Sequence, residues 1–365
     1  MEYKKYKDIT ISRLGFGNMR LPEKEGRIDR EKASAMIDRA MKGGVTYYDT
    51  AWMYHHEDSE TFLGEVLPNY PRDSFCLATK FNIGFNPDYR HVFETQLKKL
   101  KTDYLDFYLL HAIGDNTIHP YVDDGSLAYL IEQKEKGRIR NLGFSCHASN
   151  DSLRWFVEQY DWDFAQIQLN CFDWLFSHTQ EEYRILEERN IPIVVMEPVR
   201  GGRLSRLTPE AEAMLHEAHP EWSLASWMFR FVRSLPQVQV ILSGMSTMDQ
   251  VEDNLRTFDD DNNFTDTDRD LLFKAMEMFH DNMQVPCTAC RYCCDDCPMG
   301  INIPEFITYY NKFKVDGTFG LKEQLDKVET MATPDECLNC GSCANHCPQS
   351  IDIPSIMTEM GEKFY

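Results

Sequence analysis

The cysteines of this chain are concentrated in a repeated motif near its C-terminal end. Nine of the 12 lie between Cys287 and Cys347. Eight of these nine form two runs that lie fifty residues apart: Cys287-x2-Cys290-x2-Cys293-x3-Cys297-Pro298 and Cys337-x2-Cys340-x2-Cys343-x3-Cys347-Pro348. The flanking sequence repeats as well, since Ile301-Asn302-Ile303-Pro304 answers Ile351-Asp352-Ile353-Pro354. The segment is an internal duplication with two matching sets of metal ligands.

The spacing within each run suits an iron–sulfur cubane. Three closely spaced thiolates can wrap one face of a 4Fe–4S cluster while backbone amides point at its sulfurs, and the proline ends the run. The alternative is structural zinc, because paired Cys-x2-Cys motifs also bind Zn²⁺. A third cysteine two residues further on and the Cys-Pro ending favour iron–sulfur. Cys294 is an extra thiol, which we interpret as a bystander rather than an alternative ligand.

The doubled motif resembles the bacterial two-cluster ferredoxins. In that family the fourth cysteine of each run ligates the other cluster. The resemblance implies two 4Fe–4S clusters, one held by Cys287, Cys290, Cys293 and Cys347, the other by Cys337, Cys340, Cys343 and Cys297. Residues 304–314 and 354–363 each read as a helix with proline in its first turn. We therefore expect a small, helix-rich ferredoxin-like domain.

Length and composition place this module after a larger domain. With 365 residues and 42% hydrophobic composition, the chain can form one large domain and a small one. The shift in cysteine content predicts a first domain over residues 1–280 and a ferredoxin-like domain over 281–365. A net charge of −21 disfavours nucleic acid and anionic membranes as partners. With no apolar run long enough to span a bilayer and no signal peptide, we expect a cytoplasmic protein.

Strand-like and helix-like patterns alternate through the first 280 residues. Eight β-strands in βα alternation over this length predict an α/β fold, a closed (β/α)8 TIM barrel. Residues 1–11 precede the first strand and are expected to form a hairpin that closes the barrel floor. The predicted strands are Ser12–Asn18, Val45–Asp49, Phe75–Lys80, Tyr104–His111, Arg140–Ser145, Phe164–Asn170, Ile193–Pro198 and Val238–Gly244.

Four polar residues fall at or just after neighbouring strand ends: Asp49, Tyr54, Lys80 and His111. Chemistry in such barrels sits at the C-terminal ends of the strands. Taken singly, each residue is more often a surface charge, a cap or a satisfied polar group than a catalyst. Together they predict one catalytic site at the barrel mouth.

These residues resemble the aldo/keto reductase family, over roughly residues 11–254. The motifs are Tyr48-Asp49-Thr50-Ala51-x2-Tyr54, Thr79-Lys80, Leu109-Leu110-His111, Gly15-Phe16-Gly17 and Gly143-Phe144-Ser145. The resemblance implies an oxidoreductase that reduces an aldehyde or ketone to an alcohol, or the reverse, by hydride transfer with NADPH or NADH. It makes Tyr54 the general acid, with a pKa lowered by Lys80. Asp49 would orient Lys80, and His111 would position the carbonyl.

The same resemblance implies the contacts to the nicotinamide cofactor. Ser145, Gln166 and Asn170 would surround the nicotinamide amide, and Met196 stands where an aromatic ring usually stacks. Many relatives grip a 2′-phosphate with cationic residues at the positions of Gly244 and Gln250, so both NADH and NADPH remain open. Arg200 or Arg203 could compensate. The remaining expected contacts are Gly201 and Gly202 at the pyrophosphate, and Gly244, Ser246, Gln250 and Asn254 at the adenosine end.

The two halves pose a problem of electron counting. A nicotinamide passes two electrons at once, a 4Fe–4S cluster passes one, and no flavin-binding signature is found to link them. Three interpretations remain open. The chain is a reductase of a small-molecule carbonyl whose clusters exchange electrons with a redox protein partner or the substrate; or the clusters are only structural; or the protein is an electron carrier whose barrel serves docking or sensing.

Overall fold

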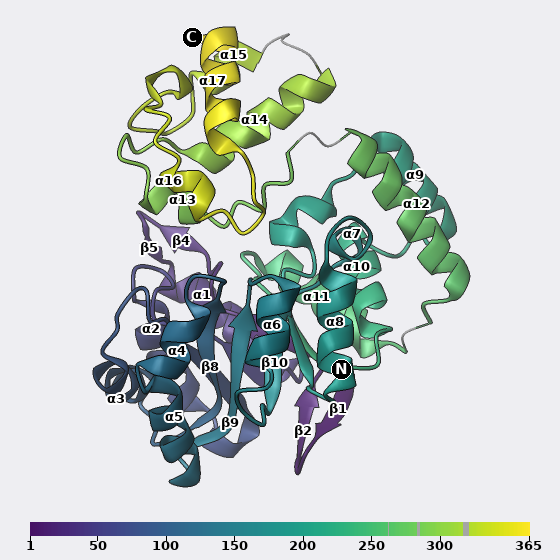
Figure 1. The fold of residues 1–365 in the computed structure, drawn as a ribbon. Helices are drawn as coiled ribbons and strands as arrows, with labels where there is room; N and C mark the ends of the chain where they lie inside the picture. Colours follow the sequence, from purple (N-terminus) through teal and green to yellow (C-terminus); the bar gives the residue numbers. More distant parts are fainter. Residues whose placement is uncertain (262, 283–284, 317–320) are drawn as a thin grey trace. The chain divides into compact units, whose positions relative to one another are not determined.

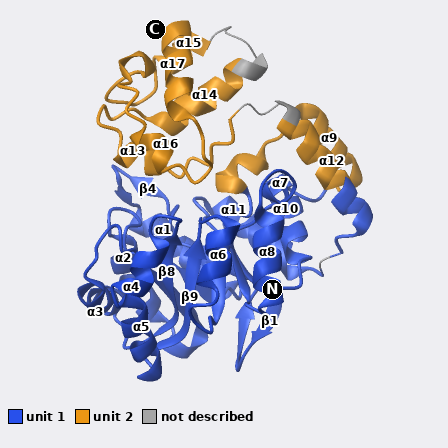
Figure 2. Cartoon of the chain, in the orientation of Figure 1, with its two compact units in different colours: residues 1–199, 220–270 blue, residues 200–219, 271–365 orange. Residues whose placement is uncertain are grey.

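The computed structural model describes residues 1–261, 263–282, 285–316 and 321–365 (Figure 1). The chain divides into two compact units, each described here by itself (Figure 2). Unit 1 contains residues 1–199 and 220–270, and unit 2 contains residues 200–219 and 271–365. Residues 200–219, which the sequence groups with the barrel, therefore belong to the same unit as residues 271–365.

Unit 1 is built on a closed barrel of parallel strands, which confirms the predicted (β/α)8 fold. Each predicted strand is present, with ends that differ from the prediction by a few residues. Each barrel strand pairs with the next barrel strand along the chain, and the last strand pairs with the first, which closes the barrel. The strands are β3 (Leu14–Gly17), β6 (Tyr47–Asp49), β7 (Cys76–Phe81), β8 (Leu105–Ile113), β9 (Ile139–Cys146), β10 (Phe164–Gln168), β11 (Ile193–Met196) and β12 (Val238–Ser243).

Helices connect these strands and present an apolar face to the barrel. In α1 (Arg30–Lys42) the buried residues Ala33, Met36, Ile37 and Ala40 recur at helical spacing. The Asp29 side chain accepts a hydrogen bond from the Lys32 amide and so begins this helix. The other helices of unit 1 are α2 (Ser59–Val66), α3 (Tyr89–Leu100), α4 (Ile118–Asp123), α5 (Ser126–Glu135), α6 (Asn150–Phe156), α7 (Cys171–Phe176), α8 (Thr179–Glu188), α10 (Leu224–Arg233) and α11 (Met248–Asp259).

A hairpin of β1 (Tyr3–Tyr6) and β2 (Ile9–Ser12) closes one end of the barrel, as predicted for residues 1–11. Tyr6 and Ile11 are buried in one cluster with Tyr47, Phe107 and Phe164. The Tyr6 hydroxyl donates to the carbonyl of Asp163, at 2.8 Å. The C-terminal ends of the strands lie at the opposite end of the barrel. A second short hairpin, β4 (Glu23–Lys24) with β5 (Arg27–Ile28), follows the first barrel strand.

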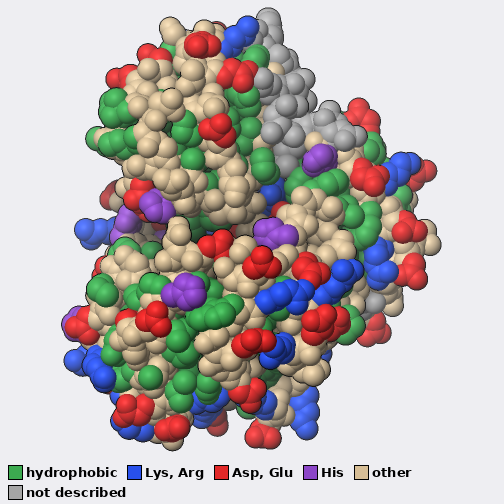
Figure 3. Space-filling model, in the orientation of Figure 1, with side chains coloured by type: hydrophobic (Ala, Val, Ile, Leu, Met, Phe, Trp, Pro, Cys, Tyr) green, Lys and Arg blue, Asp and Glu red, His purple; other side chains and the backbone are tan. Residues whose placement is uncertain are grey.

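The face shown in Figure 3 carries Asp and Glu side chains spread among other residues rather than gathered in one patch. This distribution agrees with the net charge of −21. Within the described residues, no helix is long and apolar enough to span a bilayer.

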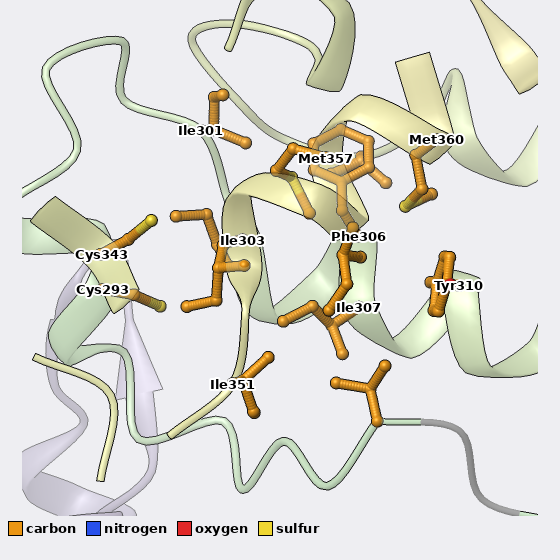
Figure 4. Packing of buried hydrophobic residues seen from close by; sticks show 14 of the residues in the cluster. Cys293, Ile301, Ile303, Phe306, Ile307, Tyr310, Cys343, Ile351, Met357 and Met360 are labelled. Carbon is orange, nitrogen blue, oxygen red and sulfur yellow. The ribbon is translucent and has the colours of Figure 1, made fainter. Parts of the chain in front are cut away.

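Unit 2 is helical, and its apolar core joins the two copies of the repeat. Phe306 and Ile307 of one copy are buried against Met357 and Met360 of the other (Figure 4). Cys293 and Cys343 lie together at one edge of this core. The elements are η3 (Arg200–Ser205), α9 (Pro209–Ala218), α12 (Asp266–Asn282, from residue 271 onward), α13 (Tyr292–Asp295), α14 (Ile303–Asp316), α15 (Leu321–Leu325), η4 (Pro334–Glu336), α16 (Ser342–Asn345) and α17 (Ile353–Phe364).

Candidate functional site

The four residues predicted for catalysis converge at the barrel mouth. Asp49 ends β6, Lys80 lies in β7 and His111 lies in β8. The Lys80 ammonium group donates to Asp49 Oδ1 at 2.5 Å and to the carbonyl of Thr50 at 2.7 Å. It also lies 3.5 Å from the hydroxyl oxygen of Tyr54, which follows β6 in a turn. Lys80 therefore joins the carboxylate to the phenol.

His111 completes this group on the other side of Tyr54. The two rings meet edge to face, with centroids 6.1 Å apart and planes at 81°. The hydroxyl of Tyr121 donates to the His111 carbonyl at 2.6 Å, which fixes the backbone there. His111 Nδ1 is buried and, among the described residues, has no hydrogen-bond partner. A phenol and an imidazole thus flank the same space beside a buried ammonium group.

Burial dominates the charge states of this group. It raises the pKa of Asp49 and lowers the pKa of Lys80, and the ion pair between them opposes both shifts. Burial, with the charges of Lys80 and His147, holds the pKa of His111 well below its usual range. The imidazole is therefore neutral at neutral pH, and its N–H can donate to a carbonyl oxygen.

The pKa of Tyr54 differs from the sequence prediction. Burial raises it well above its usual value, and the charges of Asp49 and Glu197 raise it further, while Arg20 opposes them. The sequence instead predicts that Lys80 lowers this pKa. In this structure Tyr54 therefore keeps its proton at neutral pH. Any stabilisation of its phenolate by Lys80 would have to arise as the proton leaves.

A buried polar network that the sequence reasoning missed supports Lys80 from behind. The Gln96 amide donates to Glu60 Oε1 at 2.7 Å and to the carbonyl of Lys80 at 2.9 Å. Thr79 donates to the same Glu60 oxygen at 2.6 Å, and the Tyr108 hydroxyl donates to Gln96 Oε1 at 2.6 Å. Glu60 and Gln96 lie on α2 and α3, so no strand-end rule could have found them.

Of the residues expected around the nicotinamide, Ser145, Gln166 and Met196 lie on β9, β10 and β11, and Asn170 follows β10. Ser145 accepts the amide of Ala112 at 2.8 Å. Gln166 Nε2 lies 3.5 Å from the sulfur of Met196, whereas Gln166 Oε1 is buried without a hydrogen-bond partner among the described residues. Asn170 caps α7 and donates to Asp173 and to the Glu197 carbonyl. Gln166 thus offers an acceptor for an amide, while the Asn170 side chain serves the local backbone.

The residues expected at the adenosine end lie together after β12. The Asn254 amide donates to Ser243 Oγ at 2.8 Å, and Gln250 Oε1 accepts the Ser246 amide at 2.7 Å. Ser246 Oγ donates to the carbonyl of Arg20 at 2.6 Å. A Cβ built on Gly244 would come within 3.2 Å of the Arg20 side chain. Arg20 therefore lies against this segment, a contact that the sequence did not predict.

The partner of Arg20 is Glu197, which the sequence reasoning passed over. Arg20 Nη2 lies 3.2 Å from Glu197 Oε1. Glu197 directly follows β11 with a φ of 56°, a left-handed conformation that costs free energy in a residue with a side chain. Its Oε2 is buried without a hydrogen-bond partner among the described residues. A charged residue directly after Met196, at a strand end, was the available signal.

Gly201 and Gly202 belong to the other compact unit, and their contact with a pyrophosphate stays a prediction. They form part of η3 in unit 2, with φ values of 64° and 88°. The neighbouring arginines belong to the same unit. Arg200 donates to Gln349 Oε1 at 2.8 Å, and the Arg203 guanidinium packs over the ring of Phe279, 5.7 Å from its centroid.

The eight cysteines of the repeated motif line two separate cavities in unit 2. One cavity is lined by Cys287, Cys290, Cys293 and Cys347, with Thr288, Arg291, Pro304, Ile307, Gln349, Ile351 and Ile353. The other is lined by Cys297, Cys337, Cys340 and Cys343, with Pro298, Met299, Ile301, Ile303, Leu338, Gly341, Pro354 and Met357. Each cavity thus collects three cysteines of one run and the fourth of the other.

The backbone around both cavities is shaped in the same way. Ala289 and Arg291 adopt φ values of 55° and 68°, and Asn339 and Gly341, fifty residues on, adopt 53° and 77°. Three of these four residues carry side chains, for which this conformation is unfavourable. Among the described residues, no three His, Cys, Asp or Glu side chains converge closely enough to hold a single metal ion. Four thiols around each cavity are the donor set that a 4Fe–4S cluster takes.

The other cysteines lie outside these two sets. Cys294 is partly buried and lines a third, open hollow with Arg291, Asn302 and Met331 rather than either cavity above. Cys76, Cys146 and Cys171 are buried. Burial raises the pKa of the Cys146 thiol, which disfavours a reactive thiolate there.

Known proteins share this organisation in parts. The family described as "Aldo/keto reductase family" matches residues 13–272, and "4Fe-4S dicluster domain" matches residues 286–351. An uncharacterised oxidoreductase of Bacillus subtilis (strain 168) is 27% identical over 68% of this chain and 88% of its own. The NADH-specific methylglyoxal reductase of Escherichia coli (strain K12) is 25% identical over 54% of this chain and 67% of its own.

A solved structure agrees with these sequence matches. The aldo-keto reductase of Bacillus halodurans in its holo form is 26% identical, with a TM-score of 0.63 over 75% of this chain and 96% of its own. The matched family covers most of the chain, and the closed barrel is its fold. The chain belongs to the aldo/keto reductase family of oxidoreductases, and it also contains a 4Fe–4S dicluster domain.

Proposed function

We propose that this oxidoreductase reduces the carbonyl group of a small molecule to an alcohol, or runs the reverse reaction, with a nicotinamide cofactor. The observation that carries the proposal is the position of Lys80 Nζ, 2.5 Å from Asp49 Oδ1 and 3.5 Å from the Tyr54 hydroxyl. A carbonyl oxygen gains negative charge during reduction and needs a proton donor. Protonated Tyr54, beside a buried cation, meets that need.

Each residue has a separate task in this proposal. Tyr54 donates the proton to the substrate oxygen, and Lys80 stabilises the phenolate that forms. Asp49 holds Lys80 in place. Neutral His111 donates an N–H to the same oxygen and orients the carbonyl. A nicotinamide, when bound, would supply the two electrons and the hydrogen for the carbonyl carbon.

The residues at the barrel mouth fit a nicotinamide. Gln166 Oε1, buried and without a partner in the described part of the chain, could accept a hydrogen bond from its carboxamide, and the Met196 sulfur lies beside Gln166 Nε2. Of the two dinucleotides we propose NADH. Gln250 is engaged with the Ser246 amide, and Arg20 is paired with Glu197, so neither is free to bind a 2′-phosphate. The melting temperature of the protein with NADH or NADPH tests this choice.

We further propose that unit 2 holds two 4Fe–4S clusters, with the crossed ligand sets that line the two cavities. Lining by four thiols, three from one run and the fourth from the other, supports a cubane over a single zinc ion. The clusters would exchange electrons one at a time with a redox protein partner, and the acidic net charge favours a basic one. Iron and sulfide analysis, with zinc measured in parallel, tests this assignment.

The decisive experiment for catalysis is Tyr54→Phe in anaerobically purified protein. Phenylalanine keeps the ring and loses only the proton donor. We expect carbonyl turnover to disappear while the dinucleotide still raises the melting temperature as in the wild type. Turnover retained within a few-fold of the wild type would reject Tyr54 as the acid, whatever the clusters do.

A second experiment separates the role of the clusters. The same preparation is mixed with NADH and a carbonyl compound, and cluster absorbance and alcohol formation are recorded together. Cluster bleaching without turnover in the wild type would favour an electron carrier over a reductase. Turnover retained in a Cys340→Ser variant that still folds would favour a structural role for that cluster.

A further inference from the structure

The turn after Tyr54 has a backbone conformation that residues with side chains rarely adopt. His55, His56 and Glu57 follow one another with φ values of 51°, 53° and 68°. All three lie in the left-handed region, which is unfavourable for any residue other than glycine. Such a turn persists only where contacts from its surroundings hold it, and turns of this kind are common beside catalytic groups. The contacts that hold this turn therefore bear on Tyr54.

Backbone hydrogen bonds link this turn to Tyr54 and to the start of α2. The Ser59 amide donates to the Tyr54 carbonyl at 3.2 Å, and the Asp58 amide donates to the His55 carbonyl at 3.1 Å. Both carboxylate oxygens of Asp58 accept hydrogen bonds from Arg30 of α1. The turn is thus fixed at its helix end, and the position of Tyr54 depends on what holds His55 at the other end.

The His55 imidazole ties the turn to the segment that follows β3, and its side chain is 5% exposed. Its Nε2 accepts a hydrogen bond from the Leu21 amide at 3.1 Å, and its Nδ1 lies 2.8 Å from Glu23 Oε1. A backbone N–H can only donate, so Nε2 is the nitrogen without a proton and Nδ1 carries one. The two contacts therefore require the neutral ring in a single tautomer.

The segment that His55 contacts also meets the residues proposed for the dinucleotide. Arg20 directly precedes Leu21, its guanidinium pairs with Glu197, and its carbonyl accepts a hydrogen bond from Ser246. The strands that precede the two segments, β3 and β6, are paired neighbours in the barrel. His55 thus connects the turn of the proton donor to the dinucleotide side of the same mouth.

Protonation of His55 would break one of its two contacts. An imidazolium carries a hydrogen on each nitrogen, so Nε2 would face the Leu21 amide as a second donor, while Nδ1 would keep Glu23 as its acceptor. Burial lowers the pKa of His55 and the charge of His56 adds to this, while Glu23 from β4 and Asp58 from the same turn oppose it. The ring is therefore neutral at neutral pH and loses the Leu21 contact on the acid side.

We propose that His55 is a positioning residue for the proton donor: its neutral ring holds the turn after Tyr54 against Leu21 and Glu23, and protonation of the ring releases that turn. This inference rests on the proposed carbonyl reduction, in which Tyr54 is the acid. His55 acts through the backbone of Tyr54 rather than on the substrate. Its loss should therefore slow proton delivery and leave dinucleotide binding unchanged.

The test compares two variants of the full chain, purified anaerobically, in carbonyl turnover. His55→Phe keeps a ring and loses both hydrogen bonds, whereas His55→Gln keeps one donor and one acceptor and cannot be protonated. Above the pKa of His55, we expect His55→Phe to lower kcat by about 10- to 100-fold with KM little changed. His55→Gln should restore most of that loss. In both variants the dinucleotide should raise the melting temperature as in the wild type.

The matched controls are His56→Phe and His56→Gln. They make the same two changes one residue further on, at an exposed side chain whose backbone has nearly the same φ. Neither control should lower kcat. Equal losses at the two positions would mean that any change in this turn slows the enzyme, and would overturn the specific role of His55.

The pH profile separates positioning from general damage to the fold. In the wild type, kcat should fall as the pH drops through the pKa of His55, because the Leu21 contact is lost. His55→Gln should keep its turnover to lower pH, and the two His56 variants should keep the wild-type decline. An acid decline in His55→Gln equal to that of the wild type, or full turnover in His55→Phe, would overturn the proposal.

The ¹⁵N resonances of the histidine side chains give a test that needs neither turnover nor a stable phenylalanine variant. Those absent from His55→Gln belong to His55, and at neutral pH they should report a proton on Nδ1 alone. A proton on Nε2 alone would overturn the proposal. A wild type that reduces no aldehyde or ketone with either dinucleotide would instead reject the proposed function, which separates that failure from this one.

Discussion

Lys80 Nζ lies 2.5 Å from Asp49 Oδ1, and the two side chains are 0% and 4% exposed. A buried ion pair contributes little net stability, because desolvation offsets the attraction, but breaking it leaves one charge uncompensated. The pair is thus better explained by the Tyr54 hydroxyl 3.5 Å away than by folding. Stability and catalysis should therefore respond differently to substitutions here.

Removing the lysine alone should damage both properties. Lys80→Met leaves the Asp49 carboxylate buried, and we expect a loss of about 3–5 kcal/mol in the free energy of unfolding. The double variant Lys80→Met with Asp49→Asn should recover most of that stability but no turnover, since Tyr54 still lacks its cation. Melting temperature and carbonyl turnover, measured on the wild type, the single variant and the double variant, check this. A single variant as stable as the double one would contradict it.

The stability of the protein should decline on the acid side partly because of His147. Burial lowers the pKa of His147 from 6.5 to about 4, so the folded state stays neutral where the unfolded state takes up a proton. The stabilisation that neutral His147 gives the folded state is complete above pH 6.5. It is lost as the pH falls toward 4, by up to ~1.4 kcal/mol per pH unit in the free energy of unfolding. His147→Gln should therefore show a shallower decline in melting temperature between these limits. Parallel curves for the two proteins would refute this.

The buried hydrogen-bond network of Gln96 and Glu60 should affect turnover by holding Lys80 in position. Gln96→Leu removes the donor to Glu60 and to the Lys80 carbonyl, and it also leaves the Tyr108 hydroxyl unpaired. We expect a loss of about 2–4 kcal/mol, since each buried group left without a partner costs ~1–3 kcal/mol. Turnover should fall as Lys80 shifts, while the dinucleotide still binds.

The same substitution at the surface is the control for Gln96. Gln159→Leu removes one hydrogen bond, to the carbonyl of Trp155, at a partly exposed site. It should change the melting temperature by no more than a degree or two. If Gln96→Leu is as mild as Gln159→Leu, the buried network does not hold Lys80.

Much of this structure could be predicted because its signals are local. The alternation of strands and helices predicted the barrel. The rule that catalytic residues lie at the C-terminal ends of barrel strands predicted that Asp49, Lys80 and His111 lie close together. The residues that were missed act through tertiary contacts. Glu60 lies on a helix and shows its role only where Gln96 and Thr79 converge on it. The raised pKa of Tyr54 likewise depends on how deeply the ring is buried, which no motif records.

The grouping of residues 200–219 shows a second limit. A Gly-Gly pair after the seventh barrel strand is weak evidence for a pyrophosphate-binding turn, and that contact stays a prediction. In the structure this segment packs within unit 2, where Arg200 reaches Gln349, 149 residues further on. Contacts between residues so far apart cannot be inferred from spacing alone.

Glu197 should determine which dinucleotide the protein prefers. Its carboxylate pairs with Arg20, which lies against Gly244 and Ser246. Glu197→Gln removes the negative charge and frees the guanidinium for a 2′-phosphate, so NADPH should bind about ten-fold tighter relative to NADH, ~1.4 kcal/mol. Calorimetric titration with both dinucleotides measures this ratio. Arg20→Gln should not gain NADPH affinity, and a gain there would contradict the argument.

Loss of the clusters should unfold unit 2 and spare the barrel. Metal-binding free energy is folding free energy where the ligands come from separate segments, as the cysteines of each cavity do. The left-handed backbone at Ala289 and Asn339 would have no ligand to offset its cost. Limited proteolysis of protein stripped of iron should therefore cut within residues 285–365 while a fragment containing the barrel survives. Equal resistance with and without iron would mean that the apolar core of Phe306, Ile307 and Met357 is sufficient to hold the unit.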